Sequence, residues 1–231
     1  MMSLLTACPR IPSPPSSSTI LEFRFPDTAL TGNLTLAAFF FQESSDPAQR
    51  VQVLTKGTLT RDGNYAYPGD SNSGAIVNGG TLQLASYALD PLKNNVACLA
   101  PFKTGEAAGL QNVVVTPDTV KTCNVYFTLF REANGNGKPD KSEEVFNTHD
   151  IYSYADTAFS YSFSSTDGKS EERGTRVSGW SLVRHEVLQP TATPGQYRVT
   201  MNSVLAPDQG LTIRLHEPTN RLISMGLGGL K

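Results

Sequence analysis

The sequence has little charge and no long apolar segment, and both shortages exclude classes of protein. Charged residues make up 17% of the 231 residues and the formal net charge is -2, whereas about a quarter of an average soluble chain is charged. Lysine and arginine are scattered along the chain, so we expect no basic surface for nucleic acid. The longest apolar run, residues 34–41, has the length of a strand and is far shorter than the roughly 18 residues that a membrane-spanning helix needs.

Catalytic motifs are also missing. The three histidines are His149, His185 and His216. No two of them have the spacing of metal ligands on a helix, and no Gly-x-Ser-x-Gly segment marks a nucleophile. His149 and the adjacent Asp150 could form part of a triad with one of the many serines, but a surface or core position is the simpler interpretation. We therefore predict that the protein is not an enzyme.

Short β-type segments separated by turns fill most of the chain. Long helical periodicity is absent, and glycine or proline recurs roughly every eight to twelve residues. Residues 123–130 are rich in apolar and aromatic side chains, and residues 159–163 alternate aromatic residues with serine. Such alternation buries one face of a strand and exposes the other. These patterns predict an all-β protein made of two packed β-sandwich-like halves.

A shift in composition divides the chain. The strand pattern weakens between Asp90 and Thr116, which marks a domain boundary or a long connection. We therefore predict a tether over residues 1–19, a first β-sandwich-like domain over residues 20–100 and a second over residues 110–231.

The first cysteine, Cys8, follows the small and apolar residues Leu5-Thr6-Ala7. This segment resembles the lipobox of bacterial lipoproteins, and the Pro/Ser-rich residues 9–19 would suit a tether behind it. The resemblance implies a lipid on Cys8, attachment to a membrane and a place in the bacterial cell envelope. Residues 1–5 contain no basic region and too short an apolar region, so a complete signal peptide would begin upstream of Met1. An ordinary buried or free cysteine is the alternative.

The other two cysteines, Cys98 and Cys123, remain as a pair if Cys8 carries lipid. An even number of cysteines in an oxidising compartment predicts a disulfide between them. The bond would close a loop of about 25 residues and stabilise the fold by roughly 3 kcal/mol on the chain-entropy model. Two reduced core cysteines in a cytosolic protein are the alternative.

Residues 132–143, with the sequence EANGNGKPDKSE, have the ligand spacing of a twelve-residue calcium loop. Oxygen-bearing side chains stand at loop positions 1, 3, 5, 9 and 12, with glycine at position 6 and a backbone carbonyl at position 7. The predicted ligands are the side chains of Glu132, Asn134, Asn136, Asp140 and Glu143, and the carbonyl of Lys138. A solvated hairpin with ordinary surface acids is the alternative.

The segment resembles the EF-hand loop, with two departures. Position 1 is Glu132 where aspartate is usual, and Pro139 at position 8 has no N–H for pairing with a second hand. The flanking residues also have the pattern of strands, so the loop is more similar to the isolated EF-hand-like loops inserted in secreted bacterial β-sandwich modules. Three carboxylates and two amides predict weak binding, with a dissociation constant on the order of 10⁻⁴ to 10⁻³ M.

Together these features predict a non-enzymatic envelope lipoprotein that is stabilised by calcium and has a structural or adhesive role, with an envelope protein or a polysaccharide as partner. A carbohydrate-binding module is an alternative, because aromatic residues could form a surface that stacks on sugars. Those residues are Tyr152, Tyr154, Phe159, Tyr161, Phe163 and Trp180. The same residues would also suit a buried core. A hydrolase whose site the sequence does not reveal is the third hypothesis.

Overall fold

The structure is a computed structural model, and its strands confirm the all-β fold with two packed sandwich-like halves. It describes residues 20–25, 34–42, 44–46, 49–59, 65–66, 76–77, 81–94, 98–102, 109–140, 142–188, 190, 192–204 and 211–216. The strands are β1 (Ile20–Arg24), β2 (Leu34–Phe41), β3 (Val51–Leu59), β4 (Tyr65–Ala66), β5 (Ile76–Val77), β6 (Thr81–Ala85), β7 (Leu110–Thr116), β8 (Thr122–Phe130), β9 (Glu144–Thr148), β10 (Ile151–Ala155), β11 (Phe159–Ser165), β12 (Ser170–Arg176), β13 (Gly179–Leu188), β14 (Tyr197–Val204), β15 (Leu211–Thr212) and β16 (Leu215–His216). Two short helical segments, η2 (Ser86–Leu89) and α1 (Asp90–Asn94), follow β6. No helix in the described part of the chain is long and apolar enough to span a bilayer.

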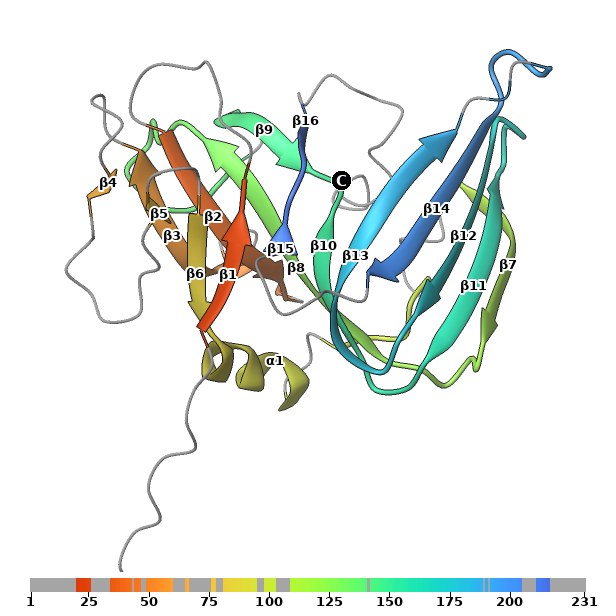
Figure 1. The fold of residues 1–231 in the computed structure, drawn as a ribbon, viewed down its shortest axis with the longest axis horizontal. Helices are drawn as coiled ribbons and strands as arrows, with labels where there is room; N and C mark the ends of the chain where they lie inside the picture. The colour runs from red at the N-terminus through yellow and green to blue at the C-terminus, as the bar shows by residue number, and fades with distance from the viewer. Residues whose placement is uncertain are drawn as a thin grey trace, which may run out of the picture.

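Within the described residues the strands form two sheets (Figure 1). The larger sheet has 12 strands and runs in the order β4-β3-β2-β8-β10-β13-β14-β12-β11-β7, with β9 paired to β8 and β16 paired to β9. The smaller sheet has the order β15-β1-β6-β5. Strand β2 lies between β3 and β8, and its first six residues are buried on both faces of the sheet. This burial explains why its sequence is an almost continuous apolar run rather than an alternating one.

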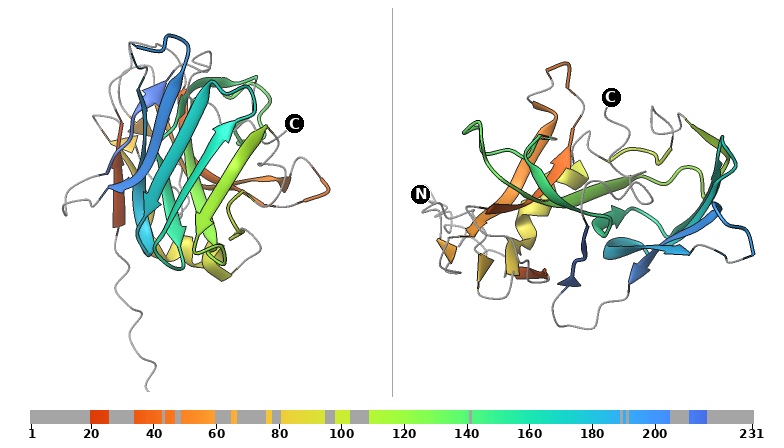
Figure 2. Two further views of the ribbon diagram at one scale, coloured as in Figure 1. Left: turned by 90° about the vertical axis from the view of Figure 1, so that its right-hand side faces the viewer. Right: turned by 90° about the horizontal axis from the view of Figure 1, so that it is seen from above.

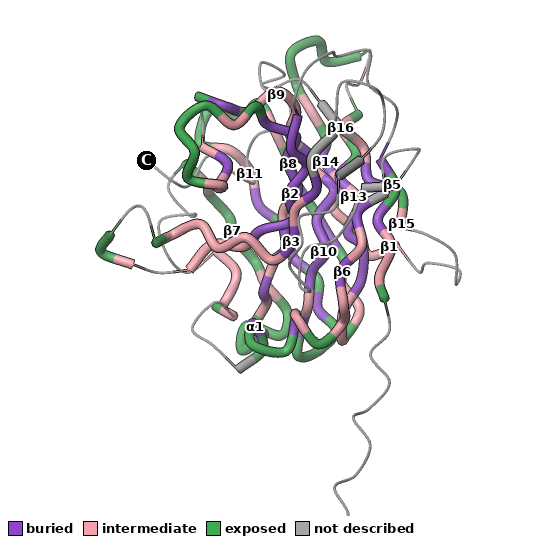
Figure 3. The backbone as a smooth tube through the Cα atoms, turned by 90° about the vertical axis from the view of Figure 1, so that its left-hand side faces the viewer, coloured by how far each residue is buried: buried purple, intermediate pink, exposed green. Residues whose placement is uncertain are grey.

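The first core lies between the smaller sheet and the centre of the larger one. Phe23 of β1 and Phe127 of β8 meet there, with ring centroids 4.8 Å apart, and both side chains are almost fully buried. Ile213, near the end of the described chain, belongs to the same cluster. Figure 3 shows this burial concentrated along β2, β8 and β10. The first core is therefore built from both ends of the sequence.

The second core belongs to the curved part of the larger sheet, where β14, β12, β11 and β7 lie side by side (Figure 2). Along β11, Phe159, Tyr161 and Phe163 are buried, whereas the intervening serines face away from this core. The predicted alternation of this strand is confirmed. Gly174 of β12 lies opposite Tyr161, and a side chain there would collide with the Tyr161 ring.

Hydrogen bonding crosses the predicted boundary between residues 100 and 110. Strand β2 pairs with β8 from Thr35 opposite Phe130 to Phe39 opposite Tyr126, and β15 pairs in parallel with β1. Both halves of the sequence therefore contribute strands to each sheet, and β8 joins them in the larger one.

Candidate calcium-binding loop

The candidate loop connects β8 to β9 and lies mostly exposed beside β9 (Figure 3). Its two ends are held together, because the Arg131 N–H donates to the carbonyl of Glu143 over 2.9 Å. The Glu143 N–H in turn donates to the Asp140 carbonyl over 3.1 Å. Both flanks are strands, as predicted, so the loop is set in a β framework and not between helices.

Glu132, at position 1, organises the first turn of the loop. One of its carboxylate oxygens accepts the Gly135 N–H and the other accepts the Gly137 N–H, each over 2.8 Å. Both glycines have positive φ, 74° for Gly135 and 69° for Gly137, a conformation that favours residues without a Cβ. Glutamate at position 1 is therefore compatible with a sharp turn around its carboxylate.

The amide side chains form two successive Asx turns. Asn134 Oδ1 accepts the Asn136 N–H over 2.9 Å, and Asn136 Oδ1 accepts the Lys138 N–H over 2.7 Å. Asn134 Nδ2 also donates to Asp140 Oδ2 over 2.8 Å. A hydrogen bond from the side chain of Ser142 to Asp140 is the main reason why the pKa of Asp140 lies below its ordinary value. Asp140 is therefore charged at neutral pH.

Glu143, at position 12, is the buried carboxylate of the loop, with only 5% of its surface exposed. Its Oε1 accepts the N–H groups of Ala133 over 2.8 Å and Asn134 over 3.1 Å. Its Oε2 is buried and has no hydrogen-bond partner among the described residues. A buried charged oxygen without a donor is costly, and a cation would remove that cost.

All six predicted ligand positions thus belong to one closed loop, but their carboxylates do not converge. Among the described residues, no group of three or more His, Cys, Asp or Glu side chains is arranged to hold a metal ion. Glu132 and Glu143 are instead held by backbone N–H groups, and Asp140 by Ser142 and Asn134. The donor set consists of hard oxygens, which fits calcium chemically.

Lys56 of β3 also contacts the loop, although it lies far from the loop in the sequence. Its Nζ donates to the carbonyl of Gly137 over 3.2 Å, and a Cβ at Gly137 would collide with that ammonium. The loop therefore reaches past β2, which separates β3 from β8. No sequence signal marks this contact, because 81 residues separate the two partners.

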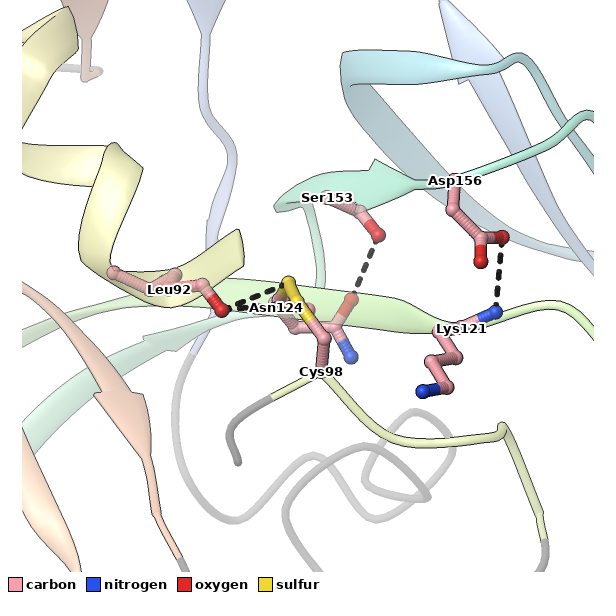
Figure 4. The surroundings of a disulfide bond; sticks show 7 residues. Leu92, Cys98, Lys121, Asn124, Ser153 and Asp156 are labelled. Atoms are coloured by element: carbon pink, nitrogen blue, oxygen red, sulfur yellow. Dashed lines mark hydrogen bonds between the residues drawn. A yellow bond between two sulfur atoms is a disulfide. The ribbon is translucent and has the colours of Figure 1, made fainter. Parts of the chain in front are cut away.

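The predicted disulfide between Cys98 and Cys123 is confirmed. It joins the segment after α1 to the start of β8, where Leu99 and Thr122 also exchange two backbone hydrogen bonds. The carbonyl oxygen of Leu92, in α1, lies 3.0 Å from Cys98 Sγ (Figure 4). The disulfide thus fastens the connection between the two predicted domains to the central strand.

Asp150, considered above as part of a triad, is instead committed to a salt bridge. Its side chain is completely buried and bonds to Arg214 through Nη2 at 2.9 Å and Nε at 3.1 Å. The Asp150 carboxylate is the main reason why the pKa of Arg214 is raised. The rings of His149 and His185 lie nearby with centroids 5.3 Å apart, and His185 is buried, as its core interpretation requires.

The aromatic residues weighed as a sugar-binding surface are mainly core residues. Tyr152, Phe159, Tyr161 and Phe163 are each no more than 7% exposed. Trp180 is half-buried and stacks on Tyr152, with ring centroids 5.2 Å apart and ring planes inclined by 9°. This packing accounts for these four aromatic residues and Trp180 without a bound sugar.

Cys8 and the predicted tether lie outside the described residues. Comparison with models of protein families, with curated proteins and with solved structures finds no significant match.

Proposed function

We propose that the protein is a non-enzymatic structural or adhesive module of the bacterial cell envelope, stabilised by one calcium ion in the loop of residues 132–143. The observation that carries the proposal is the buried Oε2 of Glu143, which has no hydrogen-bond partner among the described residues. A carboxylate in that state favours a bound cation, and each of the six predicted ligand positions supplies an oxygen, the donor that calcium prefers.

Binding requires a small rearrangement of the loop. The carboxylates of Glu132 and Glu143 would turn from their backbone donors toward a shared ion, and Asp140 would join them directly or through water. Asn134 and Asn136 already present amide oxygens within the same closed turn, and the Lys138 carbonyl completes the predicted set. The ion would stabilise the connection between β8 and β9 and take no part in any reaction.

The disulfide supports a location outside the cytoplasm, because such bonds persist in oxidising compartments. It also pairs Cys98 with Cys123, which leaves Cys8 as the odd cysteine of the three. A lipid on Cys8 would then attach the module to a membrane through residues 9–19. Replacement of Cys8 by serine should release the protein from the membrane fraction, and unchanged fractionation would refute lipid attachment.

Calcium binding is tested by thermal unfolding in chelator and in millimolar calcium. An ion at tenfold excess over its dissociation constant adds about 1.4 kcal/mol to the free energy of unfolding, which raises Tm by about 3 to 6 °C in a chain of this size. Magnesium should stabilise less at equal concentration, because it demands octahedral geometry and retains its waters. Identical melting in calcium and in chelator would overturn the proposal.

Two variants make the test specific to the loop. Glu143→Gln keeps the shape of the side chain but removes its charge, so the calcium-dependent rise in Tm should disappear. Glu171→Gln is the matched control, because Glu171 is an exposed acid on β12 and should leave the rise unchanged. Loss of the rise in both variants would mean that calcium acts through general surface charge.

A further inference from the structure

Lys56 is the cation that contacts the loop from another strand. Strand β3 alternates its side chains across the sheet, and Thr55 is buried with its hydroxyl bonded to the Gln83 carbonyl of β6. Lys56, the next residue, therefore points to the opposite face, where it meets the loop at the Gly137 carbonyl. Its side chain is half-buried there.

The ammonium of Lys56 and the carboxylate of Glu132 both form hydrogen bonds to Gly137. The Gly137 N–H donates to Glu132 over 2.8 Å, while the Gly137 carbonyl accepts from Lys56 over 3.2 Å. The positive charge of Lys56 and the predicted calcium ligand Glu132 are thus linked through a single residue, Gly137. The Lys56 charge offsets part of the negative charge of the loop when no metal is bound, and it repels a divalent cation when one enters.

From this geometry we propose that Lys56 is a built-in counter-ion of the loop, which stabilises the metal-free state and sets the calcium affinity in the weak extracellular range. The inference rests on the proposed function, since it concerns the same calcium site. Lys56 is a positioning residue, because its ammonium donates to the loop backbone at Gly137.

Removal of the Lys56 charge should lower the stability of the metal-free protein and raise its affinity for calcium. Lys56→Met retains the aliphatic stem but loses the donor to Gly137, so the protein in chelator should melt a few degrees lower. The calcium dissociation constant of the same variant should fall on the order of fivefold, because the repulsion between a unit charge and a nearby divalent ion is about 1 kcal/mol in a water-like dielectric. A purely structural role for Lys56 would instead weaken both stability and calcium binding.

The experiment is a calcium titration of the folded protein, followed by the amide NMR signals of Gly135 and Gly137. Lys56→Arg should bind calcium as the unmodified protein does, because it keeps the charge. Lys121→Gln is the matched control, since Lys121 is exposed just before β8 and the strand places it about 30 Å from the loop. Its affinity should not change.

The outcomes separate this inference from the proposed function. If the unmodified protein does not bind calcium, both the proposed function and the role of Lys56 fail. If it binds calcium and Lys56→Met binds it equally or more weakly, only the role of Lys56 fails. Tighter binding by Lys56→Met together with a lower melting temperature in chelator is the result that supports it.

Discussion

Removal of either member of the Asp150–Arg214 pair should strongly destabilise the fold. The loss of Arg214 should lower the free energy of unfolding more than the loss of Asp150. Asp150 is completely buried, whereas the Arg214 side chain is 36% exposed. Asp150 accepts the Arg214 backbone N–H over 3.0 Å as well as two guanidinium bonds. The pair therefore fixes the segment between β15 and β16 against the start of β10.

The magnitude follows from what each removal leaves behind. Loss of one partner of a buried ion pair costs about 3 to 5 kcal/mol, because the other charge stays without compensation. Asp150→Ala should cost about 3 kcal/mol, at the lower end, because the stranded Arg214 guanidinium reaches water. Arg214→Leu should cost more, about 4 kcal/mol, because the buried Asp150 carboxylate does not reach water and keeps only the longer contact with Arg184, at 4.0 Å. On the melting temperature these values correspond to about 6 to 16 °C.

Urea denaturation at neutral pH measures both values from the midpoint, provided that the slope is unchanged. The double variant should cost less than the sum of the single ones, because both single variants remove the same interactions between Asp150 and Arg214. Asp118→Ala is the control, because Asp118 is exposed in the turn after β7 and should change stability by less than about 0.5 kcal/mol. A cost for Asp150→Ala equal to or above that of Arg214→Leu would refute the reasoning.

Three further predictions concern the second core and the disulfide. Burial raises the pKa of Glu172 above its ordinary value of 4.5, so the folded protein binds this proton more tightly than the unfolded chain, and stability should fall as pH rises from 4.5 through the raised pKa. Glu172→Gln should remove that decline, and a stability curve of unchanged slope would contradict the assignment. Gly174→Ala should destabilise the fold by about 1 to 3 kcal/mol in urea, because its Cβ would collide with the Tyr161 ring and with the backbone carbonyl of Met201; a neutral effect would show that both can move away. Replacement of both Cys98 and Cys123 by serine should lower the free energy of unfolding by about 3 kcal/mol, which the urea midpoint under non-reducing conditions would reveal.

Features encoded within one short segment were predictable from the sequence. The alternation over residues 159–163 fixes which face of β11 is buried, because side chains along a strand alternate with a period of two. The turn formed by residues 132–143 was also predictable, because its glycines, amides and first carboxylate all lie within twelve residues. The disulfide was predictable because Cys98 and Cys123 are the only two cysteines of the sequence that remain once Cys8 is set aside.

Features that depend on contacts between distant segments were not predictable. The parallel pairing of β15 with β1 brings together the two ends of the described chain, and no local pattern specifies it. The contacts of Lys56 with Gly137 and of Asp150 with Arg214 were likewise not predictable, because 81 and 64 residues separate the partners. The direction of the loop carboxylates was also not encoded, since backbone N–H groups compete with a metal for the same oxygens.

The position of β8 explains why the disulfide and the candidate calcium loop lie where they do. This strand is the only one in the described chain that pairs with β2, β9 and β10 together, so it carries the connection between the two halves. The disulfide holds the start of β8 at Cys123, and the candidate loop follows the last residue of β8, Phe130. A disulfide holds one end wherever the compartment is oxidising, whereas an ion held by weak ligands would hold the other end only where calcium is abundant. On the proposed function, the strand would be secured at both ends outside the cell and at neither end in a reducing, calcium-poor cytoplasm, as expected of a module that is stable only after export.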